Sequence, residues 1–173
     1  MTNDVFIEQI VKRKTTGKYV AYKILICLGG MILSLCAIPM LMSKLFAPFA
    51  LLVFIAGFYL AWYFVTMLDV EFEYIYTNGE IDIDKISGKR KRIRLTTVKV
   101  SSFELFEKYS ESNCKNNKYD ITLMCSDDIK NPDNYCATYH GKGGKHCLLI
   151  FAPQENMLEQ INRISRLTKF NRG

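Results

Sequence analysis

Two long apolar runs dominate the hydropathy pattern of the chain. Ile24 to Ser43 contains 20 residues without a charged side chain, Leu45 to Leu68 contains 24, and only Lys44 separates them. A helix needs about 20 apolar residues to cross a hydrocarbon core of about 30 Å. A chain of 173 residues cannot bury two such runs side by side in a water-soluble core. The pattern therefore predicts a transmembrane hairpin over residues 24–68, with spans at about 24–43 and 45–68.

After Leu68 the period of the pattern changes from helical to alternating. Apolar side chains recur at every second position on both sides of Asn78-Gly79, a dipeptide typical of two-residue hairpin turns. Such a turn pairs Thr77 with Glu80 and places the apolar residues of both strands on one face. These apolar positions are Val70, Phe72, Tyr74, Tyr76, Ile81 and Ile83.

Further strands and one helix complete the predicted soluble part. The basic stretch around Lys89 to Arg94 follows a short loop, for instance Ser87-Gly88-Lys89, and the strand signals after it are Val98 to Phe106, Tyr119 to Cys125, Tyr135 to His140 and His146 to Phe151. A helical pattern starts at Pro153, with Met157, Leu158, Ile161, Ile164 and Thr168 on one side. The expected fold class is an α+β membrane protein: a helical hairpin, then seven antiparallel strands in a sandwich or barrel, then a C-terminal helix.

The first 23 residues form a separate juxtamembrane segment in this division. Val5, Phe6, Ile7, Ile10 and Val11 follow a capping residue at partly helical spacing. An interfacial helix and an unstructured basic tail are both consistent with this pattern. The expected organisation is therefore residues 1–23 at the membrane surface, 24–68 in the membrane and 69–173 as a single cytoplasmic domain.

The positive charge is concentrated near the predicted spans. The formal net charge is +6; residues 1–23 contribute five basic and two acidic residues, Lys44 adds one positive charge, and residues 69–173 carry 17 basic and 15 acidic residues. Basic residues collect on cytoplasmic flanks, so we expect both termini in the cytoplasm and a multi-pass protein of the inner membrane. A nucleic-acid-binding domain would carry its basic surplus in the folded part, so no nucleic acid partner is expected.

Two basic clusters are candidates for binding anionic lipid. They are Lys12, Arg13 and Lys14 before the first span, and Lys89, Arg90, Lys91, Arg92 and Arg94 in the predicted basic strand. The register of the strands gives an alternative for the second cluster. A loop of three residues sets Arg92 opposite Asp84 and Arg94 opposite Asp82, and cross-strand pairs of opposite charge stabilise a sheet by about 0.2–1 kcal/mol each. We favour this self-neutralised strand face over an anion site.

Catalytic and metal-binding signatures are weak. The six cysteines contain no CxxC pair, which fits a reducing compartment, and the histidines are His140 and His146 alone. A zinc site would need Cys136, His140, His146 and Cys147, and a cysteine nucleophile would need Cys136 or Cys147 beside His140. The sequence carries no GxSxG, HExxH or Walker motif. We therefore expect no catalytic residue, metal or cofactor, and rank a cysteine-dependent enzyme below both binding functions.

The order of elements resembles a known fold. Seven short strands followed by an amphipathic helix is the order of a pleckstrin-homology-like domain, and the stretch VEFEYIYTNGEIDIDKISGKRKRIRL resembles bacterial membrane-associated domains of this kind. With DVFIEQIVKRK at its start, the chain looks like an uncharacterised family of small bacterial two-span proteins with a domain-of-unknown-function label. The resemblance implies two nearly orthogonal sheets closed at one end by the helix. A fold does not carry a function with it.

The expected function is that of a non-enzymatic, membrane-anchored binding or scaffolding module. Its partner is expected to be a protein or a second copy of the chain, since strand-rich sandwiches accept peptides along exposed sheet edges. Recognition of anionic lipid by the two basic clusters is the alternative.

Overall fold

The computed structural model describes residues 4–114 and 118–171, and it divides them into two compact units. One unit is helical and contains residues 15–70 with the turn 87–89; the other contains the remaining described residues and holds almost all of the β structure. Residues 4–14 belong to the unit that holds the β structure, which we call the β unit, although the whole helical hairpin follows them in the chain.

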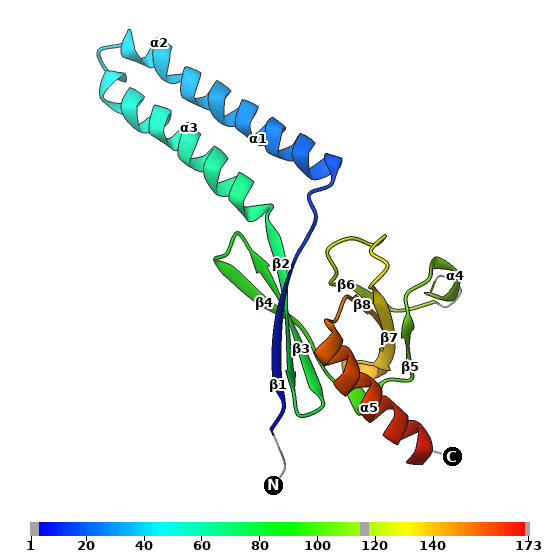
Figure 1. Cartoon of the computed structure of the whole chain (residues 1–173). Helices are drawn as coiled ribbons and strands as arrows, with labels where there is room; N and C mark the ends of the chain where they lie inside the picture. The colour runs from blue at the N-terminus through cyan, green and yellow to red at the C-terminus, as the bar shows by residue number, and fades with distance from the viewer. Residues whose placement is uncertain (1–3, 115–117, 172–173) are drawn as a thin grey trace. The chain divides into compact units, whose positions relative to one another are not determined.

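The helical unit is a hairpin of apolar helices (Figure 1). Helix α1 covers Gly17–Leu35, the short helix α2 covers Ala37–Leu41, and helix α3 covers Ala47–Met67. The first arm, Gly17–Leu41, is 25 residues long and the second, Ala47–Met67, is 21, so both are long enough to cross a membrane. Only 17% and 11% of their most apolar windows are buried within the described structure.

Small residues hold the two arms of the hairpin together. The Ser34 hydroxyl donates hydrogen bonds to the carbonyl oxygens of Gly30, at 2.9 Å, and of Phe54, at 3.1 Å. A Cβ atom on Gly57 would lie 2.2 Å from the Ser34 Oγ. The two arms therefore approach closely at Gly30, Ser34 and Gly57, whereas Gly29 faces open space and takes no part in it.

The β unit contains two four-stranded sheets. Sheet A has the order β1-β2-β3-β4, from β1 (Phe6–Lys12), β2 (Val70–Thr77), β3 (Glu80–Ser87) and β4 (Lys91–Lys99). Sheet B has the order β5-β7-β8-β6, from β5 (Leu105–Lys108), β6 (Ile121–Met124), β7 (Tyr135–His140) and β8 (His146–Phe151). Short helices η1 (Val100–Ser102), α4 (Glu111–Cys114) and η2 (Lys142–Gly144) lie in the connections, and α5 (Glu155–Asn171) ends the chain (Figure 1).

Three sequence predictions about this unit are wrong. The described residues form eight strands and not seven, because Phe6–Lys12 is a strand, and neither an interfacial helix nor an unstructured tail. The predicted strand Val98 to Phe106 is divided by η1 between β4 and β5. Strand β6 runs parallel to β8, so the sheets are not wholly antiparallel.

The core lies between the inner faces of the two sheets and α5. The alternating residues expected on one face of the β2–β3 hairpin are all buried, with Tyr74, Ile81 and Ile83 at 0% exposure. The Tyr74 hydroxyl donates to the Cys125 carbonyl oxygen, and its ring meets the Phe151 ring edge-on, so this side chain joins sheet A to sheet B. Burial raises the pKa of Tyr74, which keeps its hydroxyl a donor.

Helix α5 packs on the core through the face that its periodicity predicts. Met157 and Ile161 are fully buried. One turn further on, the Ile164 Cδ1 lies 3.0 Å from the position of a Cβ on Gly79, where the positive φ of the β2–β3 turn requires glycine. The helix therefore begins near β8 and reaches the β2–β3 turn.

Candidate functional site

Strand β1 is an open edge of sheet A. It pairs antiparallel with β2 on one side, from Phe6 opposite Thr77 to Lys12 opposite Glu71, and no described residue forms a strand on its other side. Asn78 N donates to the Val5 carbonyl oxygen, which fixes the odd-numbered residues of β1 as those that bond to β2. The N–H and C=O groups of the even-numbered residues therefore point away from the sheet. These residues are Phe6, Glu8, Ile10 and Lys12.

These outward main-chain groups are unpaired within the residues that the structure describes. A row of unpaired donors and acceptors is a template for another strand. The side chains of the same residues are exposed, and Phe6 and Ile10 are apolar, with exposed fractions of 63% and 58%. The edge thus offers main-chain hydrogen bonds together with an apolar surface.

A groove of about 680 Å³ borders the second half of β1. We call it the β1 groove; its wall opposite β1 is formed by the residues that precede β7 and by the start of α5. Its lining includes Gln9, Ile10, Lys12, Asp127, Asp133, Tyr135, Gln154, Glu155 and Leu158. Three acidic residues against one lysine give this groove a negative potential.

Gln9 sets the distance between β1 and the α5 side of the groove. Its Nε2 donates to the Ala152 carbonyl oxygen at 2.9 Å, and its Oε1 accepts from the Gln154 N–H at 2.8 Å. The side chain thereby satisfies two main-chain groups just before α5 and fastens them to sheet A.

Asp127 fixes the far end of the groove. Its carboxylate accepts a hydrogen bond from Asn131 at 2.6 Å and forms an ion pair with Lys14 at 3.0 Å. Burial acts to raise the pKa of this carboxyl, but the hydrogen bonds from Asn131 and Lys14 outweigh it, so the pKa lies below its usual value. The Asp127 carboxylate is thus already bonded to Lys14 and Asn131, whereas Asp133 and Glu155 have no ion pair among the described residues.

The eight basic residues that the sequence proposes as an anion site do not come together. Lys12, Arg13 and Lys14 lie on or directly after β1, whereas Lys91, Arg92 and Arg94 lie on β4, at the opposite edge of sheet A. Lys89 and Arg90 lie in the β3–β4 turn, where Lys89 has a positive φ of 56°. Three strand spacings of about 4.8 Å separate the two edges.

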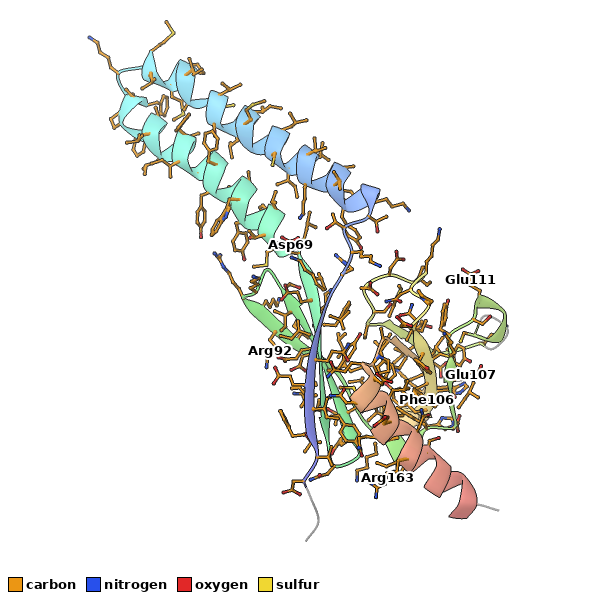
Figure 2. All side chains as sticks on the ribbon, in the orientation of Figure 1. Asp69, Arg92, Phe106, Glu107, Glu111 and Arg163 are labelled. Atoms are coloured by element: carbon orange, nitrogen blue, oxygen red, sulfur yellow. The ribbon has the colours of Figure 1, made fainter. Side chains whose placement is uncertain are left out.

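Two of the arginines are paired with acids of other strands in sheet A. Arg92, labelled in Figure 2, places its Nη2 2.7 Å from a carboxylate oxygen of Glu73 on β2. Arg94 forms an ion pair with Asp82 at 2.7 Å and a two-pronged hydrogen bond with Asp84 on β3. The carboxylates of Glu73 and Asp84 are only 4% and 3% exposed, so these pairs are part of the sheet. The expected contact of Arg94 with Asp82 is present. The expected loop Ser87-Gly88-Lys89 is wrong, because β3 includes Ser87 and the turn covers residues 88–90. Arg92 lies 4.0 Å from Asp84 and closer to Glu73.

The residues of the proposed cysteine and zinc sites are divided between surfaces. In sheet B, Cys147 lies opposite Tyr139, and the next pair along the strands is His146 opposite His140. Because successive pairs point to alternate faces of a sheet, the Cys147 thiol and the His140 ring lie on opposite faces. Cys136 is fully buried, and burial raises the pKa of its thiol. His140 instead faces Glu104 at 3.1 Å. Among the described residues, no group of three His, Cys, Asp or Glu side chains is arranged to hold a metal ion.

The sequence comparison decides the family. The model of a family described as "Bacterial PH-like domain (DUF6106)" matches residues 3–170, nearly the whole chain. The chain belongs to this family. The match confirms the resemblance to bacterial pleckstrin-homology-like domains of unknown function, and the two apolar helices agree with a two-span member. Neither a curated protein nor a solved structure matches the chain.

Within this PH-like domain, sequence reasoning missed the β1 edge. The stretch FIEQIVK alternates in the structure, with Ile7, Gln9 and Val11 turned inward. Because Phe6 and Ile10 also place apolar side chains outside, the spacing resembled that of a helix. The signal that could have identified a strand is the β-branched and aromatic content of the segment.

Proposed function

We propose that this protein is a membrane-anchored, non-enzymatic binding module that holds an extended segment of a partner protein along β1. The observation that carries the proposal is the open edge of β1 beside the β1 groove. An added strand would take up the outward main-chain groups of Phe6, Glu8, Ile10 and Lys12, which is the usual source of affinity in strand addition. The acidic lining at Asp133 and Glu155 favours a segment with a basic side chain.

The membrane anchor in this proposal is the apolar hairpin. The exposed apolar surface of α1 and α3 extends along both helices, far beyond the few hundred Å² of a typical soluble monomer. Basic residues flank the ends of the hairpin that connect to the β unit, where Lys23 pairs with Asp69 at 2.8 Å. We infer insertion in the inner membrane with both termini in the cytoplasm.

Labelling from outside the cell tests this topology. A membrane-impermeant maleimide should react in intact spheroplasts with Lys44→Cys, at the tip of the hairpin, and with Lys130→Cys only after lysis. The parent chain corrects for its native cysteines. Labelling of Lys130→Cys in intact spheroplasts would contradict the inferred orientation.

Peptide selection tests the binding function. We expect a library of extended ten-residue peptides, displayed against the full chain in lipid nanodiscs, to yield binders with a basic residue. Ile10→Pro removes an outward N–H without removing a bond to β2, so it should weaken these binders about tenfold or more. Ile10→Thr is the matched control because it keeps the N–H. Equal affinities for the wild type and Ile10→Pro would refute strand addition.

Binding of anionic lipid at the β3–β4 turn is a second candidate, and one contact favours it. The turn packs on the end of α3: Gly88 N donates to the Asp69 carbonyl oxygen at 2.8 Å, and a Cβ on Gly88 would lie 3.0 Å from the Thr66 carbonyl oxygen. If α3 spans the membrane, Lys89 lies at the level of the headgroups. Lys89→Gln should then lower the amount of anionic lipid that copurifies with the full chain, measured by mass spectrometry, whereas Lys130→Gln should not.

A further inference from the structure

A second cavity lies on the other side of the β unit. It has a volume of about 580 Å³ and is bounded by β4, by β6 and by the β7–β8 turn. We call it the β4 cavity. Its size lies within the range of about 300–1,000 Å³ that is typical of small-molecule sites.

The charged side chains that line the β4 cavity all have the same sign. They are Arg94, Lys99 and Lys145. Arg94 is paired with both Asp82 and Asp84. Lys99 and Lys145 form no ion pair among the described residues, so the cavity retains two uncompensated positive charges.

The acidic groups near the cavity are already engaged. Thr97 and Arg94 both contact Asp82, and the Glu104 carboxylate lies 3.1 Å from His140 and 3.4 Å from His146. Each of these carboxylates therefore has a partner other than Lys99 or Lys145. Lys99 and Lys145 are therefore the cations of the lining that an anionic group could pair with.

The remaining lining combines an aliphatic wall with hydroxyl groups. Leu95, Ile121 and Leu123 contribute partly exposed aliphatic side chains. The buried Tyr139 hydroxyl lies 2.8 Å from the Thr96 hydroxyl, and both residues line the cavity. An apolar wall with a few polar groups and two cations suits a ligand that is itself divided into an apolar body and an anionic group.

We propose that the β4 cavity binds a small amphiphilic anion, an aromatic or short-chain aliphatic carboxylate, sulfonate or phosphate. The anionic group lies between Lys99 and Lys145, and the apolar body lies against Leu95, Ile121 and Leu123. This site is separate from β1 and does not depend on peptide binding there. It also differs from the basic strand surface, whose Arg92 and Arg94 are paired within the sheet.

Equilibrium dialysis tests the proposal on the full chain in nanodiscs of zwitterionic lipid. The probe is naphthalene-2-sulfonate, the uncharged comparison compound is 2-naphthalenemethanol, and empty nanodiscs give the partition background. We expect saturable binding of the sulfonate and at least tenfold weaker binding of the alcohol, because only the anion can pair with the lysines.

Three variants locate the site. Lys99→Gln with Lys145→Gln should weaken sulfonate binding about tenfold or more, and Ile121→Glu, which places an acid on the half-exposed wall, should abolish it. Lys130→Gln removes a surface charge outside the cavity and should leave the affinity unchanged. Circular dichroism verifies that each variant is folded. Binding no greater than in empty nanodiscs would overturn the proposal, as would binding that survives both cavity changes in folded protein.

Discussion

Removing one guanidinium group from β4 separates a structural role of the basic strand from lipid binding. Arg94 is 49% exposed, but its partner Asp84 is only 3% exposed, and the two groups form a two-pronged hydrogen bond. Arg94→Ser leaves the covered Asp84 carboxylate with only the longer contact to Arg92, at 4.0 Å. Lys91 is exposed and has no ion pair among the described residues, so replacing it leaves no buried carboxylate unpaired.

The magnitude follows from the burial of the acid and the exposure of the base. Breaking a fully buried ion pair costs about 3–5 kcal/mol, and exposed pairs contribute about 0–1 kcal/mol. With one partner buried and the other half in water, we expect Arg94→Ser to lower the free energy of unfolding by about 2 kcal/mol. Lys91→Ser should change it by no more than about 0.5 kcal/mol.

Urea unfolding of the full chain in nanodiscs measures this difference, followed by the near-ultraviolet circular dichroism of the tyrosines. Most tyrosines lie in the β unit, so the signal follows its tertiary packing. Equal unfolding free energies for Arg94→Ser and Lys91→Ser would refute the structural role. If Arg94→Ser were as stable as the wild type and retained less anionic lipid, the basic strand would be a lipid site.

Three further predictions concern the two sheets and the hairpin. Tyr74→Phe removes a buried hydrogen bond between the sheets and should lower the free energy of unfolding by about 1–2 kcal/mol in thermal denaturation at pH 7. Burial, only partly offset by Arg92, raises the pKa of Glu73 in the folded state, so ionised Glu73 destabilises the fold. Glu73→Gln should therefore be more stable than the wild type near neutral pH. This gain should disappear as the pH falls below the usual pKa range of a glutamate, where the wild-type side chain is protonated in both states. Gly57→Leu introduces a clash at the centre of the hairpin and should reduce the yield of monodisperse protein, whereas Gly29→Leu, where nothing lies within 4 Å, should not.

The sequence predicted those parts of the fold that depend on local patterns. The two apolar helices, the β2–β3 hairpin at Asn78-Gly79 and the buried face of α5 all follow from spacing within a single segment. The expected pairing of the strand arginines with acids also follows from register, although Arg92 contacts Glu73 on a strand two positions away in the sheet.

The parts that failed depend on contacts between distant segments. Phe6–Lys12 becomes a strand because it pairs with β2, which follows the entire helical hairpin in the chain. No pattern within the segment itself indicates such a distant partner. The parallel pairing of β6 with β8 likewise depends on the path of the intervening chain. The β1 groove was missed for the same reason, since Gln9 and Gln154 meet only in the folded protein.

Hydrogen exchange on the full chain with a selected peptide tests the central claim most directly. Strand addition at β1 predicts slower exchange for the amides of Phe6, Glu8, Ile10 and Lys12, with little change in the amides of β6 at the edge of sheet B. The inward-bonded amides of Ile7 and Gln9 should already exchange slowly without peptide. Protection confined to residues outside β1, or no change at the four outward amides in the saturated complex, would contradict the proposed function.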